Sequence, residues 1–155
     1  MALLAKVITV SDGVLEGARE DRSGHALAVH LAERGFDVVE RIVTADGTDA
    51  VAGVLRAACD GFAGLVVTTG GTGFGPRDLT PEGTRSVLER EAPGLAESMR
   101  LVSPLGRLSR AVAGTVGEAL VLNTPGSTVG CIETLDAVLD VVPHALDLLV
   151  GGQPH

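Results

Sequence analysis

The chain has 155 residues, of which 45% are hydrophobic and 21% charged, so we expect one globular domain over residues 1–155 rather than a disordered chain. A net charge of −8 and only three aromatic residues leave neither a basic surface nor stacking platforms, which argues against a nucleic-acid partner. No run approaches the ~18 apolar residues of a membrane helix, and Lys6 interrupts the short apolar start, so neither a membrane segment nor a signal peptide is predicted. The distant Cys59 and Cys131 are typical of reduced thiols in the cytoplasm.

Strand-like and helix-like segments alternate through the first half of the chain. Continuous β-branched runs predict strands, and apolar residues three and four apart, such as Leu27 and Leu31, predict helices. The predicted order is a strand at 5–10, a helix at 22–34, a strand at 37–44, a helix at 48–60 and a strand at 64–69.

The second half adds further helices and one pair of strands. Thr80-Pro81 is typical of a helix start, with Thr80 as N-cap and Pro81 as the first helical residue, in a helix that carries Val87 and Leu88. The remaining predictions are helix and loop at 94–106, a hairpin of 111–116 and 119–123 around Gly117, a helix from Ile132 to Val142, and a last helix with Ala145 to Leu149. Together these elements predict an α/β fold with a mostly parallel sheet, covered on both faces and carrying one antiparallel pair.

Four loops follow predicted strands and contain residues suited to binding. They are Ser11-Asp12, Thr44 to Gly47, the glycine-rich loop from Thr68 to Asp78, and Asn123 to Ser127. Because the carboxyl ends of parallel strands share one edge of a sheet, we expect these loops to converge on one site.

The glycine-rich loop reads T-T-G-G-T-G-F-G-P-R-D, with four glycines at residues 70 to 75. It lacks the Gly-Lys pair of a Walker A loop, and Pro76 stands where a dinucleotide fingerprint needs its third glycine. A strand, a glycine loop and then a helix can still present backbone amides to an anion. The alternative is a tight connection without a ligand, and we favour a ligand because of the flanking Thr and Arg-Asp residues.

Asp78 follows the predicted anion site closely and would repel a phosphate unless a divalent cation lay between them. Mg²⁺ is commonly held by one or two carboxylates plus substrate phosphates. Asp46 is the natural second carboxylate, although its spacing suits an N-cap of the helix at 48–60 equally well. Asp49 is a competitor that fits the first turn of the same helix, and Glu82 is best explained as a charge at a helix start.

The other polar candidates carry weaker signals. Arg22, Arg77 and Arg110 stand near loop ends, although each alone is more typical of a surface residue. The histidines at 25, 30, 144 and 155 show no ligand spacing, and Ser109 and Ser127 lack the setting of a hydrolase nucleophile.

These segments together resemble the molybdopterin adenylyltransferase family, the MoaB and Mog group that includes the G domain of gephyrin. The matching stretches are V-S-D-G, E-D-R-S-G, T-T-G-G-T-G, P-R-D-L-T-P-E, E-A-P-G-L-A-E-S-M-R, L-S-R-A-V-A-G and N-T-P-G-S-T, spread along nearly the whole chain. The resemblance implies a three-layer α/β/α fold and a homotrimer in the cytoplasm. It also implies adenylylation of molybdopterin by Mg-ATP with release of pyrophosphate, and a molybdenum-insertion protein as a partner.

The resemblance also implies roles for individual residues. Asp78 and Asp46 would be the catalytic carboxylates that hold magnesium. The substrate pocket would be formed by Ser11, Thr69, Gly70, Gly71, Thr72, Gly73, Gly75, Arg77, Ser109, Asn123, Pro125, Gly126 and Ser127.

Two departures from the family pattern keep an alternative open. Ala45 precedes Asp46 where many members have Pro, and Val129 stands where many members have Lys. Arg77 or Arg110 could replace that lost cation. The alternative function is a non-catalytic module of the same fold that binds or carries molybdopterin, whereas a nucleotide-dependent oxidoreductase is disfavoured by Pro76.

Overall fold

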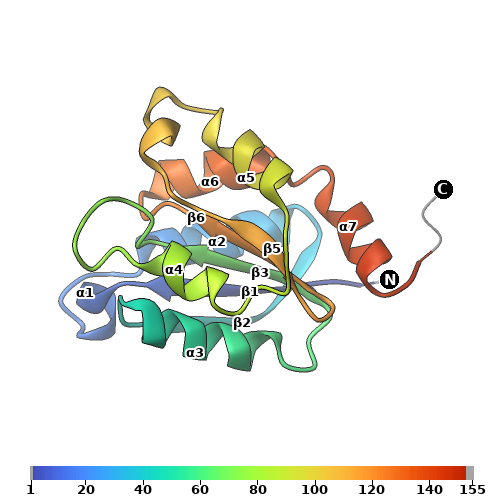
Figure 1. Ribbon diagram of the computed structural model, residues 1–155, viewed down its shortest axis with the longest axis horizontal. Coiled ribbons are helices and arrows are strands. Elements are labelled where there is room, and N and C mark those ends of the chain that lie inside the picture. The colour runs from blue at the N-terminus through green and yellow to red at the C-terminus, as the bar shows by residue number, and fades with distance from the viewer. Residues whose placement is uncertain (1, 153–155) are drawn as a thin grey trace.

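A six-stranded sheet forms the centre of the computed structural model, which describes residues 2–152 (Figure 1). The strands are β1 (Leu3–Val10), β2 (Phe36–Thr44), β3 (Gly64–Thr69), β4 (Arg90–Glu91), β5 (Ala113–Val116) and β6 (Ala119–Thr124), in the order β2-β1-β3-β6-β5-β4. The pairs β1–β2, β1–β3 and β3–β6 are parallel, whereas β5 is antiparallel to both β6 and β4. The prediction of a mostly parallel sheet with an antiparallel hairpin is therefore confirmed.

Helices cover both faces of the sheet, as the three-layer expectation requires (Figure 1). They are α1 (Asp12–Leu15), α2 (Arg22–Glu33), α3 (Thr48–Cys59), α4 (Thr80–Arg85), α5 (Pro93–Arg100), the 3₁₀ turn η1 (Pro104–Leu108), α6 (Thr128–Asp136) and α7 (Val142–Leu149). Strand β3 is buried on both sides: Leu65 and Val67 pack among residues of α2, α5, α6 and α7, and Val66 packs with α3. A strand of this kind shows no alternation in sequence, which explains the continuous apolar run.

The helix predicted to begin at Thr80-Pro81 was wrong at both ends. Thr80 is not an N-cap but the first residue of α4, because its N–H donates to Gly71 O and its hydroxyl donates to Gly70 O. Helix α4 ends at Arg85, so Val87 and Leu88 lie beyond it. The chain leaves the helix there because Glu89 N–H donates to Thr115 O, which begins pairing along β5.

The helix predicted from Ile132 to Val142 is interrupted. Helix α6 ends at Asp136, turns follow, and Val142 opens α7. Pro143 explains the restart, since proline has no N–H for the preceding turn of a helix and is tolerated only near a helix start. The single turn α1 and the two-residue strand β4 were not predicted.

Both cysteines are free and buried, as expected for reduced thiols. Burial raises the pKa of the Cys59 and Cys131 thiols to about 11, so neither is an activated thiolate at neutral pH. In the stretch from residue 2 to residue 152, no helix is both long and apolar enough to cross a membrane.

Candidate active site

The four loops selected from the sequence meet at one edge of the sheet. Strands β1, β2, β3 and β6 are parallel to one another, so their carboxyl ends lie together. Backbone hydrogen bonds join the loops: Ser11 N–H donates to Thr44 O (3.0 Å), and Gly70 N–H donates to Thr124 O (3.1 Å). The Thr69 hydroxyl donates to Pro125 O (2.9 Å). The predicted convergence of the loops is therefore confirmed.

The first two glycines of the loop are required by the protein's own backbone. Gly70 and Gly71 have φ values of 104° and 69°, in the left-handed region that favours glycine. A Cβ on Gly70 would lie 2.4 Å from Val10 O, and one on Gly71 would lie 2.2 Å from Thr80 Oγ1. Close packing at the sheet edge thus explains these two glycines without a ligand.

The outer part of the loop wraps around the carboxylate of Asp78. Gly75 N–H donates to Asp78 Oδ2 (2.9 Å), and a Cβ on Gly75 or Gly73 would lie 2.8 or 3.1 Å from that oxygen. The loop therefore holds the Asp78 carboxylate in place at its end, which supports the expectation that a cation accompanies any anion bound there.

Asp46 does not cap helix α3, whose N-cap is Gly47 without a side-chain hydrogen bond. Instead, Asp12 N–H donates to Asp46 Oδ2 (2.9 Å), and Asp46 N–H donates to Asp12 Oδ1 (3.1 Å). Burial raises the pKa of Asp46, and the negative charges of Asp12 and Asp78 raise it further. Asp49 is exposed in the first turn of α3, whereas Asp46 lies among the converging loops, so Asp46 remains the predicted second carboxylate.

Arg77 connects three of the loops. Its Nε donates to Asp12 Oδ2 (2.6 Å), and its Nη2 donates to Asp12 Oδ1 (3.2 Å) and to Asp46 O (2.9 Å). The guanidinium holds the pKa of Asp12 below its ordinary value. Asp12 was missed as a site residue, although its position directly after β1 placed it at the correct edge.

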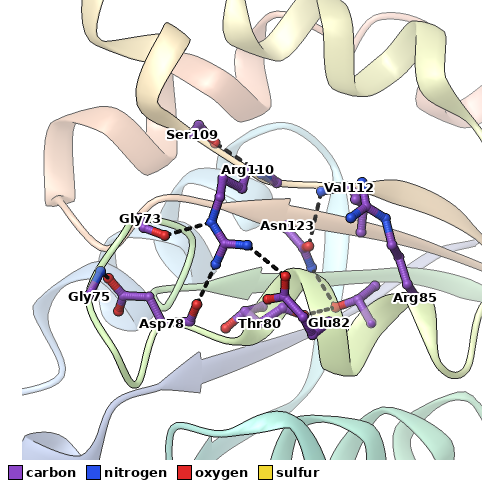
Figure 2. A network of polar contacts seen from close by, with 12 residues as sticks. Gly73, Gly75, Asp78, Thr80, Glu82, Arg85, Ser109, Arg110, Val112 and Asn123 are labelled. Carbon is purple, nitrogen blue, oxygen red and sulfur yellow. Dashed lines mark hydrogen bonds and ion pairs between the residues drawn. The ribbon is translucent and has the colours of Figure 1, made fainter.

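Arg110 is also held by protein groups, as Figure 2 shows. Its Nη1 donates to Glu82 Oε2 (2.6 Å), and this pair holds the pKa of Glu82 below its ordinary value. Glu82 stands in the first turn of α4, as expected. The two arginines considered as replacements for a lysine thus already have carboxylate partners. Arg22 also pairs with a carboxylate, that of Glu20, and both residues line the larger of the two cavities described next.

Two cavities border the glycine-rich loop and share Gly71, Asp78 and Gly126. The larger, of about 860 Å³, is polar; we call it the acidic cavity, and of the predicted residues it contains Ser11, Asp46, Thr69, Gly70 and Ser127 besides the shared ones. The smaller, of about 460 Å³, is mainly apolar; we call it the apolar cavity, and its lining includes Met99, Val102, Leu105, Leu108 and Ala111. Its predicted residues are Thr72, Gly73, Ser109, Asn123 and Pro125 besides the shared ones.

Some of the residues predicted to bind substrate line neither cavity or form hydrogen bonds within the protein instead. Gly75 and Arg77 line neither cavity. The Asn123 amide donates to Thr68 Oγ1 and Thr84 Oγ1 (both 3.0 Å), so its two hydrogens serve the core. Ser127 accepts from Gly130 N–H as the N-cap of α6. Asn123 therefore shapes the apolar cavity and has no N–H left to donate to a ligand.

Within residues 2–152, no group of three or more His, Cys, Asp or Glu side chains is placed to hold a metal ion, so side chains alone do not form a metal site there. His30 pairs with Asp136 (2.6 Å), far from the loops in sequence, and His155 lies outside the described residues. The two carboxylates Asp46 and Asp78 do line one cavity, and the negative charge of Asp78 raises the pKa of Asp46. A cation there would relieve this repulsion, with its remaining ligands supplied by a substrate.

Comparison with known proteins identifies the family. The model of the probable molybdopterin binding domain matches residues 6–144. The chain belongs to this family. A molybdopterin adenylyltransferase of Helicobacter pylori is 38% identical over 153 residues, which cover 94% of this chain and 87% of that protein. The molybdopterin adenylyltransferase of Escherichia coli is 32% identical over 164 residues, covering 94% and 84%.

A solved structure supports the same conclusion. The molybdopterin biosynthesis enzyme MoaB of Thermus thermophilus superposes with a TM-score of 0.89, with 45% identity and 99% of each chain covered. The family resemblance and the α/β fold expected from the sequence are both confirmed by these matches to the molybdopterin binding domain family.

Proposed function

We propose that this protein is a molybdopterin adenylyltransferase, which transfers the adenylyl group of ATP to molybdopterin and releases pyrophosphate. Family membership and the names of the full-length relatives support this proposal. The observation that carries it is the pair of cavities joined at Asp78, because a transfer reaction needs two substrates to meet at one point. An oxygen nucleophile of molybdopterin attacks the α-phosphorus, and the bond between that phosphorus and the bridging oxygen of the leaving pyrophosphate breaks.

The acidic cavity suits the triphosphate and its metal ion. Asp46 and Asp78 would hold Mg²⁺, which would neutralise charge on the phosphates. The residues fit this ion because Asp46 and Asp78 line the same cavity, and the repulsion by which Asp78 raises the pKa of Asp46 would be relieved by a cation. Ser127 and Thr128 at the start of α6 add positive backbone dipoles on the same side.

The apolar cavity suits a flat heterocyclic ring. Its volume of about 460 Å³ lies within the usual range for small-molecule sites, and aliphatic side chains form much of its wall. Ser109 lines it, with an Oγ that accepts from Ala111 N–H (3.2 Å) and keeps its own hydrogen to donate. We assign the ring of one substrate to this cavity, with its phosphate directed toward Asp78.

The chemistry asks for positioning and charge stabilisation more than for a covalent intermediate. Gly71, Asp78 and Gly126 form the boundary at which the two substrates would be aligned. Neither thiol is poised as a nucleophile, since burial raises the pKa of both cysteines to about 11. The protein therefore acts by bringing the two phosphates together.

We also propose that the protein works as a homotrimer in the cytoplasm and delivers its product to a molybdenum-insertion protein. These expectations follow from the family resemblance. Sedimentation equilibrium at several concentrations tests the trimer, and a mass equal to that of one chain would contradict it.

Isothermal titration calorimetry with separate and combined ligands tests the proposed function. We expect Mg-ATP and molybdopterin each to bind alone, and molybdopterin to bind also in the presence of Mg²⁺ and a non-hydrolysable ATP analogue. Tight binding of molybdopterin without any binding of Mg-ATP would instead support the non-catalytic binding module.

A further inference from the structure

Arg110 reaches from the segment between η1 and β5 onto the glycine-rich loop (Figure 2). Its backbone N–H donates to Thr72 O (2.9 Å), and its Nε donates to Gly73 O (2.8 Å). Its Nη2 donates to Asp78 O. One residue therefore holds the loop where it leaves the sheet and again where Asp78 ends it.

Other contacts also restrain the outer part of this loop, since Arg77 donates to Asp12 and to Asp46 O, and Gly75 N–H donates to the Asp78 carboxylate. Its base is secured by Thr80, which donates to Gly70 O and Gly71 O, but residues 74–77 are exposed. Within residues 2–152, no other side chain donates a hydrogen bond to Gly73 O or Asp78 O. Without Arg110 these two carbonyls would turn to water, and Asp78 would be held in place only through Gly75 and through the contacts of Arg77.

Glu82 fixes the guanidinium in this arrangement. Its Oε2 accepts from Arg110 Nη1 (2.6 Å), while its Oε1 is buried and has no hydrogen-bond partner in the described part of the chain. A partly desolvated carboxylate needs its cation, because leaving it unpaired costs far more than an exposed pair gains. Glu82 thereby balances the positive charge of Arg110, so Arg110 orients the loop instead of attracting a phosphate.

We propose that Arg110 is a positioning residue that holds Asp78 at the boundary between the two cavities. Its neighbour Ser109 lines the apolar cavity, so the same short segment shapes one cavity and fixes the carboxylate of the other. The planar guanidinium is suited to this role, since it donates in three directions at once, which the single ammonium of a lysine cannot reproduce. This inference rests on the proposed function for its consequence in turnover, but not for its effect on the loop.

The test compares Arg110→Lys and Arg110→Gln with Arg107→Gln, which removes an exposed arginine whose Nε bonds only locally, to Pro104 O. We expect ¹⁵N backbone order parameters at Gly73 and Gly75 to fall from about 0.85 toward about 0.6 or below in both Arg110 variants. They should stay unchanged at Val66 in β3, and throughout the Arg107 variant. Unchanged values at Gly73 and Gly75 would overturn the proposal, as would an equal fall at Val66, which would mean that Arg110 supports the whole fold.

A second measurement determines the Mg²⁺ concentration that turnover requires. In the Arg110 variants the Mg²⁺ concentration for half-maximal turnover should rise about 10- to 100-fold, as expected when a residue that orients a metal ligand is lost. An unchanged Mg²⁺ requirement in an Arg110 variant with a mobile loop would contradict the positioning role. If the unaltered protein shows no transfer at all, the proposed function fails, and the order parameters still decide whether Arg110 holds the loop.

Discussion

Replacing Asp78 with Asn removes one negative charge at the boundary between the cavities and keeps the shape of the side chain. The amide oxygen can still accept from Gly75 N–H, so the stability cost is the difference between a charged and a neutral hydrogen bond, about 1 kcal/mol. For a chain of this length, about 1 kcal/mol lowers the melting temperature by roughly 2–4 °C. The turnover number should fall much more, by roughly 100- to 1000-fold, the usual effect of removing one electrostatic contact to a transition state.

The assay combines steady-state formation of adenylylated molybdopterin with thermal unfolding of the same samples. Asp60→Asn is a suitable control, because Asp60 is an exposed carboxylate at the end of α3 and lines neither cavity. A melting temperature that falls by 10 °C or more, or turnover within about threefold of the unaltered protein, would refute the reasoning that Asp78 serves chemistry rather than the fold.

Asp46→Asn should abolish most turnover, whereas Asp49→Asn, at an exposed position, should not; similar losses in both would contradict the assignment. Burial raises the pKa of Asp46 above its ordinary 3.8, so the ionised carboxylate destabilises the folded protein once the pH exceeds the raised value. Asp46→Asn should therefore have a higher melting temperature than the unaltered protein at pH 7, but not at pH 3, where both side chains are neutral. Gly71→Ala should lower the free energy of unfolding by about 2 kcal/mol or more, because Gly71 has a positive φ and its Cβ would contact Thr80, whereas Gly53→Ala, exposed within α3, should raise it by about 0.5–1 kcal/mol. Urea unfolding measures both changes, and equal effects would contradict the packing argument. Arg110 lowers the pKa of Glu82, so their ion pair stabilises the fold above about pH 4.5 and is lost on acidification. Glu82→Gln should therefore reduce the fall in melting temperature below pH 4.5, and an unchanged slope would argue against the ion pair.

Local patterns were sufficient for most of the fold. The unbroken apolar run of β3 and the three-and-four spacing in α3 reflect burial of a strand on two faces and of a helix on one, and each pattern is visible without tertiary information. The hairpin around Gly117 needed only its turn, where the glycine has φ 58°. The break between α6 and α7 was predictable from Pro143 and was missed because the apolar spacing continued through it.

The loops that form the site were predicted from the sequence, but the hydrogen-bond partners of their side chains were not. Parallel topology placed Asp46 and Asp78 at one edge, yet no local pattern shows that Asp12 and Asp46 exchange hydrogen bonds across 34 positions of sequence. The Arg110 side chain bonds to residues 28 to 37 positions earlier, so its role depends on tertiary packing. The glycines illustrate the same point, because Gly70 and Gly71 are required by contacts with Val10 and Thr80 rather than by a ligand.

The most direct test of the proposed transfer is a single reaction with the purified, unaltered protein. Molybdopterin, ATP and Mg²⁺ are mixed with the protein, and adenylylated molybdopterin and pyrophosphate are measured over time, with and without chelation of the metal. We predict equal amounts of both products, formed only with the protein and Mg²⁺ present. A folded protein that binds molybdopterin and yields neither product would contradict the assignment of adenylyl transfer.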